Sequence, residues 1–131
     1  MSSRDRLGGD SPVEDHRCGA ASKALRTGNL FAKLPFDLDT ELIEALTETK
    51  TVRVERIVSR GHSSPEGLWY EDPRHEWVLL VRGSATLLFE SSETLKLVSG
   101  DWVEIPARRR HRVEATNSSE DTFWIAVYYE P

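Results

Sequence analysis

From Thr51 to the C-terminus, apolar residues recur at every second position or in short runs, and turn residues interrupt them every ~10 positions. A period of two is typical of strands, because successive side chains point to opposite faces of a sheet. An α/β fold would need helical segments between the strands, and the pattern contains none. It therefore predicts an all-β sandwich or barrel. The predicted strands span residues 51–58, 68–71, 76–82, 84–90, 94–98, 102–105, 111–115 and 122–129.

The residues before these strands divide into two parts. Residues 1–26 carry few large apolar side chains, too few to offset the conformational entropy lost on ordering, so we expect a flexible N-terminal tail. Residues 27–131 then form a single domain. Within it, residues 37–46 predict one short helix, whose first turn Asp39 can cap. The apolar stripe of this helix would consist of Leu42, Ile43 and Leu46.

Composition narrows the classes of function. A chain of 131 residues is one domain in length. With 17 Lys+Arg against 22 Asp+Glu and a net charge of -5, it lacks the positive field that nucleic acids and anionic membranes require. The single cysteine, Cys18, cannot form an intramolecular disulfide, and no apolar run approaches the ~20 residues of a membrane helix. We expect a cytoplasmic protein that binds neither nucleic acid nor membrane.

Two short motifs lie in order on the predicted strands. Glu76 is followed after six residues by Gly83, and Gly100 is followed after five residues by Pro106 and then by His111. These match the second half of the first cupin motif, G-x5-H-x-H-x3,4-E-x6-G, and most of the second, G-x5-P-x-G-x2-H-x3-N. Over residues 27–130 the chain thus resembles a small single-domain bacterial cupin of unsettled activity. The resemblance implies a double-stranded β-helix, a jelly-roll barrel of two antiparallel sheets, and a homodimer.

The same comparison shows what is missing. Cupins of this kind bind a metal through the H-x-H pair, the glutamate and the second-motif histidine, and only Glu76 and His111 match those positions here. A divalent Fe, Mn, Ni or Zn ion would therefore need donors from elsewhere. His62 is the best candidate for a second imidazole, because the insertion before Glu76 could fold it back, and Glu71 could add an oxygen.

Strand alternation places the two matching residues inside the barrel. His111 shares its face with Val113, and Glu76 shares its face with Val78 and Leu80. A carboxylate on an apolar interior face needs a proton, a hydrogen-bond partner or a metal. Two explanations stay open: a metal centre completed by His62 or Glu71, or a hydrogen-bonded Glu76–His111 pair in a metal-free barrel.

Other side chains could contact a ligand at the mouth of the barrel. Residues 108–112 form the only basic cluster, and Arg108 could bind a phosphate or carboxylate there, or the cluster could be a solvated turn paired with acids. Trp69 and Tyr70 could line a pocket, although most of the four tryptophans are expected in ordinary core packing.

These observations predict a small-molecule site inside the barrel that holds a divalent metal. As an enzyme, the protein would act on a small oxygenated substrate, through the metal or with Glu76 as catalytic base. The alternative is a non-catalytic, metal-free module that binds or senses a ligand. A purely structural dimer would require large side chains to fill the cavity.

Overall fold

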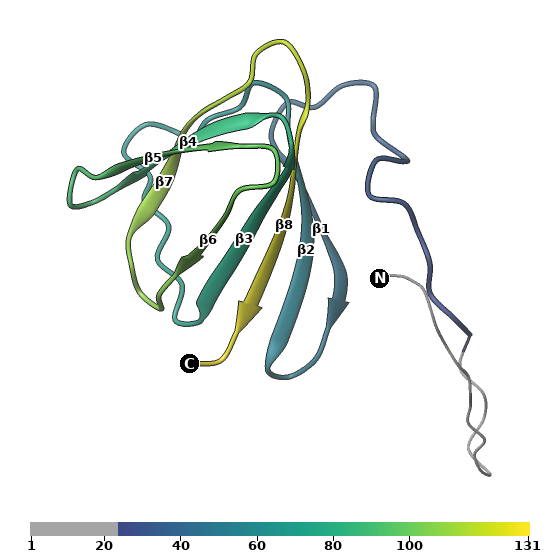
Figure 1. Cartoon of the computed structure of the whole chain (residues 1–131). Coiled ribbons are helices and arrows are strands. Elements are labelled where there is room, and N and C mark those ends of the chain that lie inside the picture. The colour runs from purple at the N-terminus through teal and green to yellow at the C-terminus, as the bar shows by residue number, and fades with distance from the viewer. Residues whose placement is uncertain (1–23) are drawn as a thin grey trace.

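Two antiparallel β-sheets form the protein in a computed structural model, which describes residues 24–131 (Figure 1). Five strands pair in the order β1-β2-β8-β3-β6 and three in the order β5-β4-β7. The all-β barrel of two antiparallel sheets predicted from the sequence is confirmed, while most of the predicted tail, residues 1–23, lies outside the described residues. The strands are β1 Leu42–Glu48, β2 Val52–Ser59, β3 His75–Arg82, β4 Ser84–Phe89, β5 Thr94–Val98, β6 Trp102–Ile105, β7 His111–Thr116 and β8 Thr122–Tyr129.

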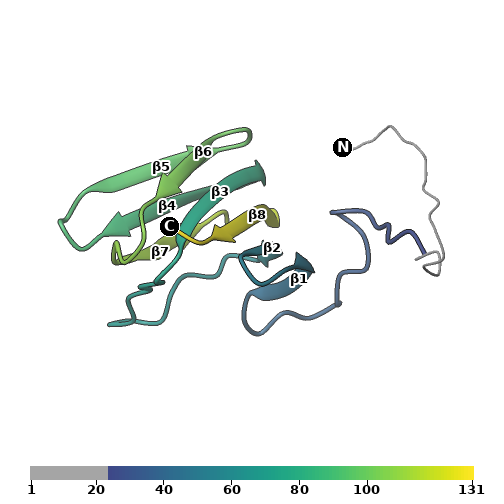
Figure 2. The ribbon, with the colours of Figure 1, turned by 90° about the horizontal axis from the view of Figure 1, so that it is seen from below.

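The core lies between the two sheets, which face each other in the view from below (Figure 2). Burial alternates along β3 and β4, so that every second side chain enters the core while its neighbours lie on the outer faces. The period of two that predicted these strands is thus the pattern of a half-buried sheet. Buried core members are Val78, Leu80, Ala85, Leu87, Phe89, Leu97, Ile105, Trp124 and Ala126.

Gly83 shows why the first motif ends in glycine. It joins β3 to β4 with a φ of 102°, a backbone conformation that disfavours any side chain. A Cβ at this position would also collide with the Thr122 hydroxyl oxygen and would lie 2.7 Å from the Thr122 Cα. Any substitution would therefore push the β3–β4 turn away from β8 and disturb the barrel at its centre.

The helix predicted over residues 37–46 is wrong. Residues 42–48 instead form the edge strand β1, which pairs antiparallel with β2 in a register that places Ile43 opposite Ile57. An isolated helix of this length is marginally stable in water, whereas β2 offers an unpaired edge to which the segment can hydrogen-bond. Tertiary pairing therefore overrides the local stripe. No helix in the described part of the chain is long and apolar enough to cross a membrane.

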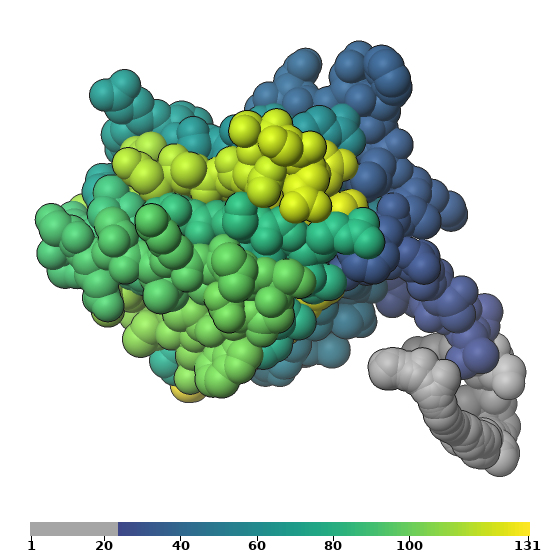
Figure 3. Space-filling view, turned by 45° about the horizontal axis from the view of Figure 1, so that its top comes forward, coloured from purple at the N-terminus to yellow at the C-terminus, as the bar shows by residue number. Residues whose placement is uncertain are grey.

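The segment before β1 packs across the outer face of the five-stranded sheet. Arg56, only 4% exposed, donates hydrogen bonds to the carbonyl oxygens of Leu30 (2.9 Å) and Ala32 (2.7 Å). Phe31 packs edge-on against Phe123 with 4.9 Å between ring centroids. Residues 24–40 consequently follow one flank of the barrel, as the purple to blue band of the space-filling view shows (Figure 3).

Candidate functional site

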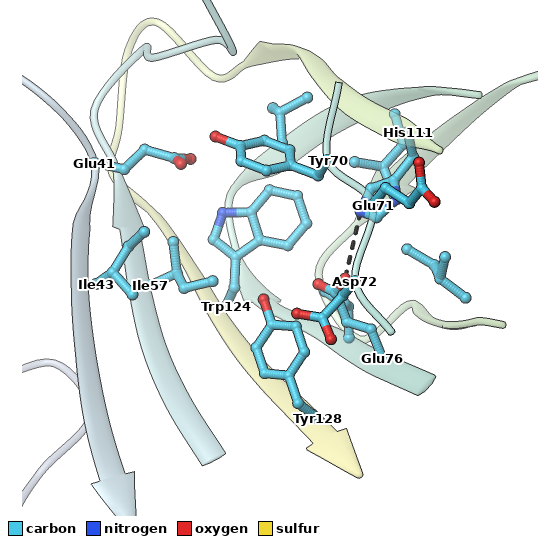
Figure 4. Close-up of a pocket in the computed structure, with 14 residues that line it drawn as sticks. Glu41, Ile43, Ile57, Tyr70, Glu71, Asp72, Glu76, His111, Trp124 and Tyr128 are labelled. Carbon is cyan, nitrogen blue, oxygen red and sulfur yellow. Dashed lines mark ion pairs between the residues drawn. The ribbon is translucent and has the colours of Figure 1, made fainter. Parts of the chain in front are cut away.

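A cavity of about 180 Å³ opens between the sheets near the ends of β2, β3, β7 and β8. Aliphatic side chains such as Ile57, Val78 and Leu87 form much of its wall, and polar groups gather at two places within it. Figure 4 shows these polar groups, with Glu41 at one end, Glu76 and His111 at the other, and Trp124 between them. An apolar chamber with a few polar groups is typical of a small-molecule site.

The Glu76–His111 pair forms one end of the cavity. Glu76 lies on β3 and His111 on β7, so the contact joins the two sheets. His111 Nε2 lies 3.4 Å from Glu76 Oε1, and the two residues are 6% and 9% exposed. His111 Nδ1 lies 2.9 Å from the carbonyl oxygen of Arg109, to which its N–H can donate, which directs Nε2 at the carboxylate.

Two opposing effects set the protonation of His111. Burial disfavours the charged imidazolium and lowers its pKa, but hydrogen bonding to Glu76 and to the Arg109 carbonyl, together with the Glu76 charge, raises it by more. The net result is a pKa above the usual value for histidine. His111 therefore stays protonated to higher pH than a free side chain, and its charge balances the Glu76 carboxylate at the cavity wall.

Tyr128 adds a neutral donor to the same end. It pairs with Glu76 in the β3–β8 register and lines the cavity. Burial, followed by the negative charges of Glu76, Glu55 and Asp72, raises the pKa of the Tyr128 phenol far above its ordinary value. The phenol therefore remains protonated at physiological pH and offers an O–H to whatever lies beside it.

The segment between β2 and β3 closes part of the mouth. Tyr70 and His111 exchange two backbone hydrogen bonds of 2.8 and 3.1 Å, so the strand predicted over 68–71 is reduced to a single bridge. This bridge places Tyr70, Glu71 and Asp72 in the cavity wall. Arg74 lies 3.0 Å from Asp72 and lowers the pKa of its carboxyl, and Arg110 lies 3.8 Å from Glu71.

His62 does not join Glu76 and His111, contrary to the prediction. Its Nδ1 accepts a hydrogen bond from the Arg60 backbone N–H at 2.9 Å, and its Nε2 lies 3.0 Å from the carbonyl oxygen of Leu38. Both ring nitrogens are thus engaged by the chain at the end of β2 and by the segment before β1. The residue fastens these two segments together and is absent from the cavity wall.

Arg108 and Trp69 lie near the mouth but outside the cavity. Arg108 lines a separate shallow hollow with its neighbours Arg109 and Arg110, and Glu71 borders both this hollow and the cavity. Trp69 lies under the guanidinium of Arg110, 5.9 Å from ring centroid to Cζ. Of the three predicted ligand contacts, only Tyr70 reaches the cavity, because Trp69 precedes it in extended chain and points elsewhere.

Glu41 is the site residue that sequence reasoning missed. Its carboxylate lines the cavity at the end away from His111 and accepts a hydrogen bond of 2.5 Å from the Ser59 hydroxyl. The same hydroxyl oxygen accepts the indole N–H of Trp124 at 3.1 Å, and Ser59 is fully buried. The sequence carried no signal for this, because Glu41 lay inside the predicted helix and the chain Trp124–Ser59–Glu41 joins three separate segments.

The residues present do not fit a metal centre. The orientation of His111, with Nδ1 toward a carbonyl and Nε2 toward the cavity, suits a ligand of a transition metal. In the described part of the chain, Glu76 is the only other metal-binding side chain that contacts His111, since Arg74 holds Asp72 and Arg110 faces Glu71. Over residues 24–131 no three histidine, cysteine, aspartate or glutamate side chains converge as a metal site would require.

Comparison with solved structures places this barrel in a family. A protein from Ralstonia eutropha JMP134, described as a putative mannose-6-phosphate isomerase, is 41% identical with a TM-score of 0.77; the match covers 81% of this chain and 99% of that one. A cupin superfamily protein from Desulfitobacterium hafniense matches at 17% identity, 75% and 84% coverage and a TM-score of 0.62. An RmlC-like cupin from Methanocaldococcus jannaschii matches at 20% identity, 75% and 87% coverage and a TM-score of 0.59.

The fold, the two motif positions Glu76 and His111 and these similarities together define a class: the chain belongs to the cupin superfamily. It is a small cupin whose described hydrophobic core lies between the two sheets of the barrel. No protein-family model matches the chain, and no curated protein matches it.

Proposed function

We propose that the protein binds a small organic molecule in the cavity between its sheets, held by side chains alone. The observation that supports this most directly is the buried Glu76–His111 pair, which faces an open chamber where a purely structural barrel would be filled by apolar side chains. Keeping an ion pair in a protein interior is costly unless something gains from it, and replacement by apolar groups is often neutral or stabilising. A ligand that hydrogen-bonds to the pair provides such a gain.

The size and chemistry of the chamber restrict the ligand. A cavity of about 180 Å³ is close to the ~150 Å³ that accommodates benzene in an engineered protein core, so a ligand of benzene size suits it. The Tyr128 phenol is a donor at the His111 end, which suits a carbonyl, carboxylate or hydroxyl oxygen on the ligand. Neither lysine nor arginine is among the described residues that line the chamber, which disfavours a phosphate inside it.

Proton transfer is a second candidate function, favoured by the coupling of Glu76 to His111. The two groups lie 3.4 Å apart and both line the chamber, as a base and an acid acting on one small substrate must. The isomerase name of the Ralstonia eutropha relative is compatible with such chemistry. For this chain, turnover would require Glu76 to accept a proton from the ligand while His111 stabilises the charge that develops.

Metal binding is tested separately. From the donor set we expect far less than one equivalent of Fe, Mn, Ni or Zn in tag-free protein measured by plasma mass spectrometry, with no uptake of added ion. Near-stoichiometric metal that both Glu76→Gln and His111→Leu abolish would overturn the metal-free part of the proposal.

Ligand binding is tested by the thermal unfolding temperature in the presence of small acids, polyols, sugars and amines. A true ligand raises this temperature in proportion to its occupancy of the folded state. We expect hits whose effect is lost in His111→Leu and kept in the control variant Glu66→Gln, which alters an exposed carboxylate outside the cavity. Compounds that stabilise wild type and His111→Leu equally would contradict the proposed site.

The homodimer implied by the family resemblance and the cytoplasmic location remain predictions. Sedimentation equilibrium on the full chain decides the first: a mass near twice 14.9 kDa supports a dimer, and a mass near 14.9 kDa at micromolar concentration contradicts it.

A further inference from the structure

Four carboxylates line the cavity, and three of them have a cationic partner. Glu76 faces His111 at 3.4 Å, Asp72 faces Arg74 at 3.0 Å, and Glu71 faces Arg110 at 3.8 Å. The fourth, Glu41, faces no lysine, arginine or histidine of the described chain within ion-pair distance. Its observed partner is the neutral hydroxyl of Ser59. Among residues 24–131, Glu41 is therefore the one carboxylate of the cavity wall without a cationic partner.

This charge is held in place by a buried chain of hydrogen bonds. Trp124 Nε1–H donates to Ser59 Oγ at 3.1 Å, and the Ser59 hydroxyl donates to Glu41 Oε2 at 2.5 Å. Ser59 is 0% and Trp124 3% exposed, so both donors are fixed by the core. Only one oxygen of the carboxylate is engaged by this chain, and the other is left for a further donor.

Aromatic side chains surround the same end of the cavity. Trp124 and Tyr70 both line it, and in the close-up Tyr70 extends from the opposite wall toward the Glu41 carboxylate, above the Trp124 ring (Figure 4). The Tyr70 backbone is fixed to His111 by two hydrogen bonds, which hold its ring at the mouth. A carboxylate flanked by tryptophan and tyrosine is the arrangement that attracts an organic ammonium ion, by charge and through the π faces of the rings.

We infer that the Glu41 end of the cavity is a cation subsite that selects ligands bearing an amine or quaternary ammonium group. This inference rests on the proposed function and names the class of its ligand. The ammonium group lies against Glu41, Trp124 and Tyr70. The remainder of the molecule extends toward the His111 end, where the Tyr128 phenol suits an oxygen on the ligand. Small amino alcohols and related zwitterions match both ends.

A matched pair of probes tests the inference. Choline and 3,3-dimethyl-1-butanol have the same shape and hydroxyl group, but only choline carries a positive charge. Each is titrated into the full chain by calorimetry, with the tryptophan indole N–H signals followed by NMR. Trp124 Nε1–H reports the site directly through its bond to Ser59. We expect choline to bind at least about tenfold more tightly, equivalent to ~1.4 kcal/mol.

Two variants then test whether Glu41 causes the preference for choline over the neutral probe. Glu41→Gln keeps an oxygen to accept the Ser59 hydrogen bond but removes the charge, and we expect it to bind the two probes equally. Glu66→Gln removes an exposed carboxylate outside the cavity and should keep the full preference for choline. Thermal unfolding of both variants establishes that each is folded, and the wild-type comparison of the two probes needs no variant.

The remaining outcomes overturn the inference in distinguishable ways. Equal binding of both probes by wild type contradicts a cation subsite and leaves the proposed small-molecule site standing. If Glu41→Gln still binds choline more tightly than the neutral probe, the positive charge is recognised elsewhere and the Glu41 subsite is contradicted. If neither probe binds, the cation subsite is contradicted, and the proposed function is judged by its own screen of acids, polyols and sugars.

Discussion

The two ends of the cavity hold a carboxylate in different ways. At one end Glu76 is balanced by the His111 imidazole, across an ion pair that joins the two sheets. At the other end Glu41 is held by a neutral hydroxyl and has no described cationic partner. The comparison teaches that a charge balanced inside the protein depends on its internal partner for the stability of the fold, whereas a charge left unbalanced toward a cavity is available to a ligand. Four predictions test that division, in order of expected effect.

The largest effect is expected from breaking the balanced pair. His111→Leu leaves the Glu76 carboxylate buried without its partner, so we expect the free energy of unfolding to fall by about 3 kcal/mol. Chemical denaturation measures the loss. The double variant Glu76→Leu/His111→Leu removes both charges and should recover much of it. A double variant less stable than His111→Leu would show that the unpaired Glu76 carboxylate is not what destabilises the single variant.

A smaller loss is expected from Ser59→Ala. This change leaves the buried Trp124 N–H without an acceptor and Glu41 without its donor, so we expect a loss of about 1–3 kcal/mol in denaturant unfolding. Ser63→Ala, at an exposed position between β2 and β3, is the control and should change stability little. An unchanged unfolding midpoint in Ser59→Ala would mean that the hydrogen-bond chain does not fix Glu41.

The pH dependence of stability separates the two ends further. The pKa of His111 is raised in the folded protein, so its contribution is fully present below the unfolded value near 6.5 and is lost as pH rises through the folded pKa. We therefore expect the unfolding free energy to decline as the pH is raised above about 6.5. The decline should vanish in the Glu76→Leu/His111→Leu variant and persist in Glu41→Gln. An identical slope in wild type and the double variant would contradict the raised pKa.

The smallest effect on stability is expected at Glu41. Glu41→Gln keeps the hydrogen bond from Ser59 and removes a charge that balances nothing in the described chain, so the unfolding free energy should change by no more than about 0.5 kcal/mol. Thermal and denaturant unfolding measure this. A loss comparable with that of His111→Leu would mean that Glu41 supports the fold, and the distinction between the two ends would fail.

Much of the barrel could be predicted from the sequence, because strand positions depend on a local signal. Seven predicted strands match β2 through β8 within about one residue at each end, since a half-buried strand alternates in burial wherever it lies. The turn at Gly83 could also be predicted, because glycine adopts positive φ values, here 102°, without strain. The helix over 37–46 was wrong because the unpaired edge of β2, which draws this segment into β1, cannot be seen from the segment itself.

In the candidate site, the residues on strands could likewise be placed from the sequence, and the residues in irregular segments could not. Glu76 and His111 were predicted to face each other inside the barrel from alternation and the cupin motifs, and the structure brings them within 3.4 Å. His62, Arg108 and Trp69 were placed by their neighbourhood in the sequence and lie outside the cavity. Their positions depend on how an irregular segment folds back, and irregular chain carries no periodicity from which a side chain's direction could be read.

The sequence by itself therefore determined the strands, the glycine turn and the inward direction of the Glu76–His111 pair, because each follows from the geometry of a few consecutive residues. Only the tertiary structure decided that Glu41 enters the cavity, since Glu41, Ser59 and Trp124 meet through three segments far apart in the chain. It also decided which carboxylates have a cationic partner. Charge balance within a cavity is a property of distances between segments, and no local pattern encodes those distances.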